Sequence, residues 1–289
     1  MHRHLGNSLK NPVSELRMQK KDIRQLLVYS NDQIISWVKM VELNHQDIEA
    51  VHQFRVKIRH LRSLIQFFRP ILNKAWVDKV NHQLRMIATH FSPVREMDVM
   101  VEWWKDIHKQ YPNAAVMNQL NQIKDKTRVE TIFRFDFDQC LQDLYQLNQK
   151  FLEMDIKLSP VSRGHFVMNR LALWEQKVVL NQAKIDTSDY PTMHKYRIST
   201  KKLRYVLSAF DSANILSHKD VKEFKKLAET LGVLTDVQFI RLKIKDIVFT
   251  DREYIEKIYD YLRNKEKKAY TQVLLLLEKK GADDDNSTR

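Results

Sequence analysis

The chain has 289 residues, of which 43% are hydrophobic and 10% aromatic, which is ample for a packed core and excludes wholesale disorder. It contains only 4 Gly, and neither a P-loop nor a dinucleotide-binding glycine motif occurs, which excludes the nucleotide sites of parallel α/β enzymes. The formal net charge of +13 at pH 7 indicates a polyanionic partner: nucleic acid, an anionic membrane surface or a phosphate polymer.

The cysteine content and the hydropathy of the chain indicate the cellular compartment in which we expect the protein. Cys140 is the single cysteine, so no internal disulfide and no cysteine-based metal site can form. The first residues lack the apolar run of a signal peptide, and no stretch approaches the roughly 18 uninterrupted apolar residues of a membrane span. We therefore expect a protein of the reducing cytoplasm, without a membrane-spanning segment.

Helical periodicity dominates the chain. The apolar spacing predicts eight long helices, at 13–43, 47–72, 74–110, 114–153, 160–186, 190–213, 217–248 and 251–280. Breakers and capping residues such as Asn73, Asn113 and Ser159 mark their limits. Two sets of four helices predict an all-α fold of two antiparallel four-helix bundles.

The domain organisation follows from these helices. We expect one ordered region over 13–280, made of a first bundle over 13–153 and a second over 157–280. The link between the bundles is short, which favours docked halves over a flexible string. The last residues, 281–289, have no periodic apolar pattern and are predicted to be a disordered tail.

One basic helical segment is written twice, from Val51 and again from Met193. Four residues of the first copy align without a gap with four of the second: His52, Arg55, Arg59 and Arg62 with His194, Arg197, Lys201 and Arg204. Because a helix turns about 100° per residue, this spacing keeps each set on one side of its helix. The two matched stripes predict one polyanion-binding surface assembled from two halves, and a gene duplication explains them most simply.

Each basic segment is followed by an Asp-Val pair. Asp98 follows Pro93, and Asp236 follows Gly232, so each pair lies near a residue that we expect to make a long helix irregular. These carboxylates would orient the imidazoles or nearby arginines, or they would act as helix caps or surface ion pairs. The sequence leaves both roles open.

The basic stripes also have a simpler interpretation as solvated faces of amphipathic helices. Two copies with aligned histidines speak against it, because a solvated face does not fix which polar residue stands where. No H-E-x-x-H motif occurs, and we predict neither a metal nor a cofactor.

The pattern H-x-x-R-[VI]-x-x-[RK]-x-L-R, repeated and followed by R-x-x-D-V and by L-G-x-L-x-D-V, resembles a CHAD domain, the conserved-histidine α-helical domain, over about residues 13–280. The resemblance implies two four-helix bundles related by pseudo-two-fold symmetry. It also implies a basic groove, lined by the two histidine helices, that binds inorganic polyphosphate. Matching the motifs residue by residue, it implies the binding residues His52, Arg55, Arg59, Arg62, Arg95, His194, Arg197, Lys201, Lys202 and Arg204.

The chain departs from the family pattern in a few places. His60 occupies a position that is usually basic, Glu96 replaces the more common Asp, and Val233 stands where the first half has Arg95. The E-x-E signature of the CYTH domain, to which many family members are fused, does not occur, which removes the best reason to expect hydrolysis.

We therefore expect a non-catalytic protein that binds inorganic polyphosphate and that could serve granule attachment, sensing or recruitment. Neither set of four aligned residues carries a carboxylate that would bind a catalytic metal or activate water. Two alternatives stay open: a nucleic-acid-binding module, and a phosphohydrolase or kinase that uses the histidines as nucleophile or general acid. The sequence does not give the oligomeric state.

Overall fold

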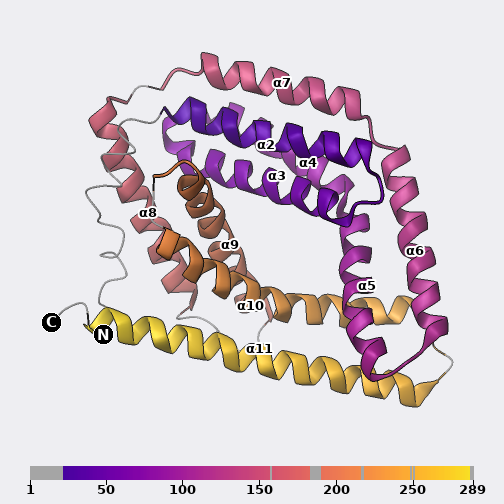
Figure 1. Cartoon of the computed structure of the whole chain (residues 1–289). Coiled ribbons are helices and arrows are strands. Elements are labelled where there is room, and N and C mark those ends of the chain that lie inside the picture. Colours follow the sequence, from indigo (N-terminus) through magenta and orange to yellow (C-terminus); the bar gives the residue numbers. More distant parts are fainter. Residues whose placement is uncertain are drawn as a thin grey trace. The chain divides into compact units, whose positions relative to one another are not determined.

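The computed structural model describes residues 22–156, 158–182, 190–215, 218–247, 249 and 251–286. Over these residues the backbone forms helices joined by turns, without a strand, which confirms the all-α fold class (Figure 1). The α-helices are α2 (Ile23–Leu43), α3 (Ile48–Phe68), α4 (Lys74–His90), α5 (Ser92–Gln110), α6 (Ala114–Phe133), α7 (Phe137–Glu153), α8 (Pro160–Gln182), α9 (Tyr190–Ser212), α10 (His218–Lys243) and α11 (Arg252–Asn286). Two 3-10 segments follow α3 and α10, at Arg69–Ile71 and Ile244–Asp246.

The two basic helices have well-defined ends. At the start of α3 the Asp47 carboxylate accepts a hydrogen bond from the Glu49 backbone N–H at 2.8 Å. At the end of α9, Asn214 adopts a left-handed φ of 54°, and the Ile215 amide donates to the Phe210 carbonyl at 2.7 Å. These local interactions place both stripes within regular helix.

The predicted helix 74–110 is divided at Phe91, and the chain continues as α4 and α5. Pro93 stands in the first turn of α5, where the backbone N–H that proline lacks would have no partner within the helix. Gly232 lies inside the continuous helix α10, so the irregularity predicted there is wrong. Glycine keeps its N–H and can stay in the helical ladder, whereas proline cannot.

The predicted helix 114–153 is also divided, at the turn 134–136. Asp136 begins the new helix α7 by accepting a hydrogen bond from the Gln139 backbone N–H at 2.9 Å. The turn contains neither Pro nor Gly, so its residues are only a weak signal for a helix end. The prediction of a continuous helix is wrong here as well.

The predicted limits of the first helix and of the C-terminal tail can be compared with the helices of the structure. Residues 13–21 of the first predicted helix lie outside the described residues. Helix α11 continues through Asn286 and so includes most of the segment 281–289 that the sequence predicts as a tail. Proline is absent from this stretch, and no residue forces the helix to stop at 280.

The helices group into two compact units. Unit 1 takes its described residues from Met1–Thr89 and Asp136–Lys226, and unit 2 takes them from His90–Phe135 and Leu227–Arg289. Each unit therefore contains residues from both predicted halves and does not coincide with the bundle over 13–153 or the bundle over 157–280. The two-bundle organisation and its pseudo-two-fold axis stay predictions about the repeat.

Unit 1 holds both basic helices. Within it, α2 packs against α3 and α7, and α9 packs against α3 and α8 (Figure 1). An aromatic cluster joins three of these helices: Phe67 of α3 lies 5.4 Å from the Trp174 ring of α8 and 5.4 Å from the Phe210 ring of α9, both edge-on. Edge-to-face ring contacts of this kind stabilise a core beyond the burial of their area, and here they fix α3, α8 and α9 together.

Unit 2 has its own core, to which α5, α6, α10 and α11 all contribute. Its buried members include Trp104, Ile107, Leu120, Val237, Ile240, Ile258 and Leu262. This shared core joins helices that are distant in the sequence.

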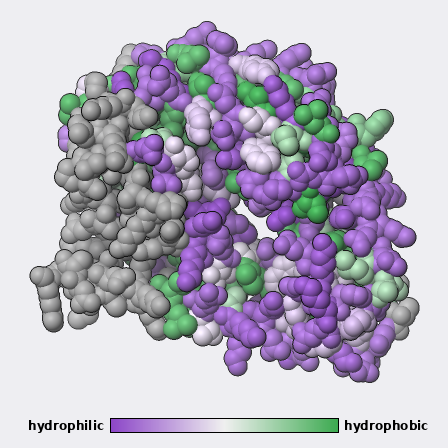
Figure 2. Space-filling model, viewed as in Figure 1, coloured by the Kyte–Doolittle hydropathy of each residue, from purple (hydrophilic) through white to green (hydrophobic). Residues whose placement is uncertain are grey.

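The surface of the described residues is largely polar. Hydrophilic residues predominate on the face shown in Figure 2, with hydrophobic ones scattered among them. Within the described part of the chain, no helix combines the length and the apolar character needed to cross a membrane.

Candidate polyanion-binding site

The two basic helices lie directly against each other in unit 1. The rings of His60 on α3 and Tyr205 on α9 are 4.6 Å apart, and the rings of Phe68 and Phe210 are 6.3 Å apart. Because the contacts advance along both helices together, α3 and α9 run in the same direction. The sequence repeat aligns Phe68 with Phe210, and the structure brings these two residues into contact.

Each helix buries an apolar face and leaves its basic face beside it. On α3, Phe54, Ile58, Leu61, Ile65 and Phe68 are fully buried. On α9, Tyr196, Leu203, Leu207 and Phe210 are fully buried. Burial of these side chains at helical spacing orients each stripe at the edge of the core, as the sequence predicts.

The predicted binding residues of unit 1 differ in exposure. His52, Arg59, Arg62, His194, Arg197, Lys201 and Arg204 are half-buried, and Lys202 is exposed. Long cationic side chains of this kind can cover apolar surface with their stems and present their charge to solvent. We call the surface formed by Arg59, Arg62, Lys202 and Arg204 the α3/α9 basic surface.

Arg55 has a different environment from its neighbours in the stripe. Its side chain is only 8% exposed, and its guanidinium donates a hydrogen bond to the backbone carbonyl of Ala88, in the last turn of α4. The carbonyls of a last helical turn lack partners within their own helix, and a cation there also interacts favourably with the helix dipole. Arg55 therefore joins α3 to the end of α4.

Cations of two further helices, α4 and α8, lie close to the α3/α9 basic surface. Burial lowers the pKa of Arg62, and nearby Arg85 of α4 and Arg59 lower it further. Partial desolvation likewise lowers the pKa of Lys202, and Lys177 of α8 and Arg62 lower it further. A like charge beside a cation raises the free energy of the charged form, and a bound polyanion would relieve this cost.

His60 lies within this positive region and is uncharged at neutral pH. Burial lowers its pKa to about 3, and Lys57, Arg204 and Arg59 contribute to the shift. The Arg204 guanidinium lies 5.0 Å from the centre of the Tyr205 ring, which His60 also contacts. His60 thus fills a position at which the family pattern is usually basic without adding charge.

The pKa of His194 is shifted by burial and by cations on its own helix, α9. Burial lowers the pKa of His194, and Arg197 and Lys201 lower it further. Cations beside a histidine on one helix face disfavour its charged form.

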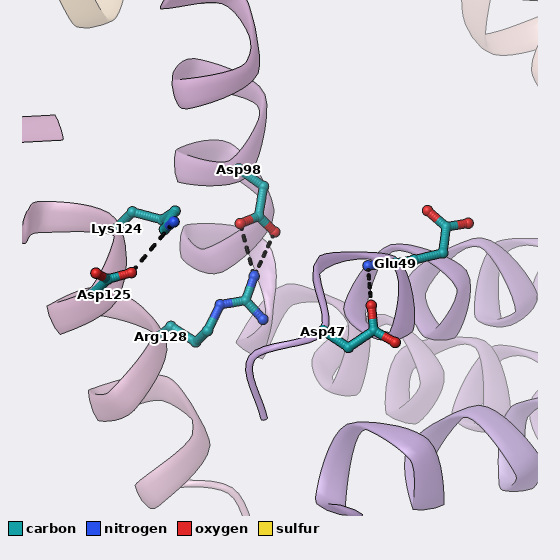
Figure 3. A network of polar contacts seen from close by, with 6 residues as sticks. All are labelled: Asp47, Glu49, Asp98, Lys124, Asp125 and Arg128. Atoms are coloured by element: carbon teal, nitrogen blue, oxygen red, sulfur yellow. Dashed lines mark hydrogen bonds and ion pairs between the residues drawn. The ribbon is translucent and has the colours of Figure 1, made fainter. Parts of the chain in front are cut away.

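Asp98 has a partner that the sequence did not indicate. Its carboxylate accepts two hydrogen bonds from Arg128 of α6, at 2.7 and 2.9 Å, and both side chains are almost fully buried (Figure 3). This pair joins α5 to α6 within unit 2. Arg95 lies half-buried on α5 near Asp98 and belongs to unit 2, whereas α3 and α9 belong to unit 1.

Several residues near the site were absent from the sequence prediction. Arg85 and Lys177 lie close enough to the α3/α9 basic surface to lower the pKa values of its members, and Lys57 lowers the pKa of the neighbouring His60. Arg85 and Lys177 stand on helices without a basic repeat, so no sequence signal pointed to them. In the described part of the chain, no cluster of three or more His, Cys, Asp or Glu residues could hold a metal ion.

Comparisons with known proteins agree with this architecture. A crystal structure of the CHAD domain from the plant Ricinus communis is similar with a TM-score of 0.61 and 19% identity, over 91% of this chain and 87% of that chain. PptA from Streptomyces chartreusis is similar with a TM-score of 0.68 and 10% identity, over 93% of this chain and 100% of that chain. No curated protein matches the chain. A family model of the CHAD domain matches residues 31–241, well over half of the chain, and this protein therefore belongs to the CHAD domain family.

Proposed function

We propose that this protein binds inorganic polyphosphate on the α3/α9 basic surface and does not turn the polymer over. The observation that carries the proposal is the gathering of Arg59, Arg62, Lys202 and Arg204 from two packed helices. None of the four forms an ion pair with a carboxylate within the residues that the structure describes.

The chemistry of these groups suits phosphate. A guanidinium stays charged at physiological pH and offers parallel N–H donors to two phosphate oxygens, while the lysine ammonium adds a compact charge. A polymer with many charges binds through many weak contacts and releases counterions, so its affinity falls steeply with salt. The remaining residues of the repeated stripes, His52, His194, Arg197 and Lys201, are proposed to contribute to the same surface, and Arg95 is proposed as a further contact.

The membership of the chain in the CHAD domain family supports a polyphosphate ligand, as the sequence motifs imply. A competition experiment separates this ligand from nucleic acid. Long-chain polyphosphate, short phosphates and DNA and RNA oligonucleotides are titrated at one salt concentration, and phosphate release is followed in parallel. We expect tight binding of long-chain polyphosphate, weak competition by oligonucleotides at equal phosphate concentration, and no phosphate release.

Pairs of alanine substitutions test whether polyphosphate binds on the α3/α9 basic surface. Arg59→Ala with Arg62→Ala should weaken polyphosphate binding and flatten its dependence on salt. Lys267→Ala with Lys268→Ala removes the same number of charges from exposed positions of α11 and should do much less. Equal losses in both pairs would mean that net charge alone explains binding, and full displacement by oligonucleotides would favour a nucleic-acid ligand.

A further inference from the structure

We propose that the binding site extends beyond the two repeated helices, with Arg85 of α4 and Lys177 of α8 as its outer contacts. Together with Arg62 and Lys202 they form a transverse row, in the order Arg85, Arg62, Lys202, Lys177, that crosses four helices. The row selects an extended polyphosphate chain over a short one. This inference rests on the proposed polyphosphate function.

The α4 end of the row follows from the α3–α4 connection. A short segment joins these helices, and Arg55, early in α3, donates to the Ala88 carbonyl, late in α4, so the two helices run antiparallel. Arg85 stands about one turn before Ala88, which places it beside the next turn of α3, where Arg59 and Arg62 lie.

The α8 end of the row follows from two contacts of α8. Arg170 donates to the Phe67 carbonyl of α3 at 3.1 Å, and about two turns later Lys177 returns to the same side of the helix. Asn181, one turn beyond Lys177, donates to the Ser199 hydroxyl of α9 at 3.1 Å. Lys177 therefore lies level with the turn of α9 that contains Lys202.

The middle of the row is the α3–α9 contact itself. The rings of His60 and Tyr205, which are in contact, lie near Arg62 and Lys202 along their helices. His60 carries no charge at neutral pH, so the row has a neutral side chain beside its centre.

The charges of the row are open to a ligand. Arg85, Lys177 and Lys202 are exposed, and Arg62 is half-buried. Within the described residues, none of the four forms an ion pair with a carboxylate, whereas Arg69 and Arg241 elsewhere are paired with Asp78 and Glu266. Beyond the effect of burial, the lowering of the pKa of Arg62 by Arg85, and of the pKa of Lys202 by Lys177 and Arg62, supports the same closeness.

The length of the row determines what can fill it. Packed helices lie about 8–10 Å axis to axis, so a ligand that contacts the whole row must extend over several helix widths. Pyrophosphate and tripolyphosphate would contact neighbouring cations only, whereas a long flexible chain can contact all of them. Arg85 and Lys177 would therefore add affinity for long chains and little for short ones.

The experiment compares two double variants of the full chain. Arg85→Ala with Lys177→Ala removes the outer contacts, and Lys79→Ala with Lys150→Ala removes two exposed cations of α4 and α7 in the same unit. For each protein, the affinities for long-chain polyphosphate and for tripolyphosphate are measured over a range of salt concentrations by titration calorimetry. Circular dichroism and thermal unfolding check that both variants fold.

We expect the outer-contact variant to lose affinity for the long chain at least several-fold more than for tripolyphosphate. Its slope of log K against log salt should shrink by about 0.7 for each lost contact, as for single-stranded nucleic acid. The control variant should keep the wild-type chain-length preference. If the two variants behave equally while the wild type binds long chains, the proposal of the row is wrong and the proposed function stands. If the wild type binds no polyphosphate, the proposed function itself is wrong.

Discussion

Arg55 shows at the scale of one residue that a sequence stripe can mix binding and structural roles. The spacing places Arg55 with Arg59 and Arg62, yet its buried guanidinium donates to the end of α4. The helical repeat predicts the side of the helix on which a residue lies. It does not predict which backbone carbonyl a neighbouring helix will bring to that side.

The role of Arg55 can be separated from ligand binding. Arg55→Ala should lower the free energy of unfolding by about 1.5–3 kcal/mol, the usual contribution of a hydrogen bond to a charged group. Arg59→Ala should leave stability within about 0.5 kcal/mol, as is usual for surface changes, and should weaken polyphosphate binding. Urea unfolding of both variants, with no ligand, is the measurement. Equal stability of the two would show that the contact with Ala88 contributes little.

His60 predicts a dependence of stability on pH. Its pKa is about 3 in the folded protein and about 6.5 in an unfolded chain, so the unfolded state binds the proton more readily between these values. The contribution of His60 to stability is therefore complete above about pH 6.5 and is lost progressively as the pH falls toward 3.

The change that tests this is His60→Gln, which cannot take up the proton. Urea unfolding between pH 7 and pH 4 should give a shallower loss of stability for the variant than for the wild type. His82→Gln, at an exposed position of α4, controls for replacing a histidine and should follow the wild type. Parallel wild-type and His60→Gln curves would mean that His60 is protonated equally in both states.

The buried pair of Asp98 and Arg128 should be essential to unit 2. Arg128→Met would leave the Asp98 carboxylate buried without its bidentate partner, and we expect a loss of about 3–5 kcal/mol in the free energy of unfolding. Replacing both residues, as Asp98→Leu with Arg128→Met, should recover a large part of that loss. A single variant as stable as the wild type would contradict this role.

At the scale of the element, sequence patterns predicted helix type well and helix continuity less well. Apolar periodicity predicted the all-α class. Pro93 correctly predicted an interruption of the helix, because proline has no backbone N–H to donate within a helix. The turn before α7 was missed because its signal is one capping aspartate, Asp136, in a sequence that also suits a helix interior. Whether such a residue caps a helix depends on tertiary contacts.

The Asp136 cap can be tested directly. Asp136→Ala should cost about 1 kcal/mol of stability, because the Gln139 backbone N–H loses its partner in the first turn of α7. Asp138→Ala removes the same charge from an exposed position in that turn and should cost less. Thermal unfolding of the two variants gives the comparison. Equal losses would mean that charge near the helix start, and not the cap hydrogen bond, is what matters.

At the scale of the whole molecule, the repeat predicted which helices form the site. It aligned the stripes of α3 and α9, and the structure packs these helices against each other. It could not predict Arg85 and Lys177, because they come from helices that carry no basic repeat and approach the site only through packing. Nor did it predict the compact units, each of which takes segments from both halves of the chain.

The central claim is that α3 and α9 form one binding surface. Its most direct test is titration calorimetry of polyphosphate of uniform length with the wild type and with the variant Lys202→Ala, Arg204→Ala, which changes α9 alone. One shared surface predicts a single class of sites in both proteins, with unchanged stoichiometry and lower affinity in the variant. A variant that retains half of the sites at wild-type affinity would contradict the account, because each helix would then bind the polymer on its own.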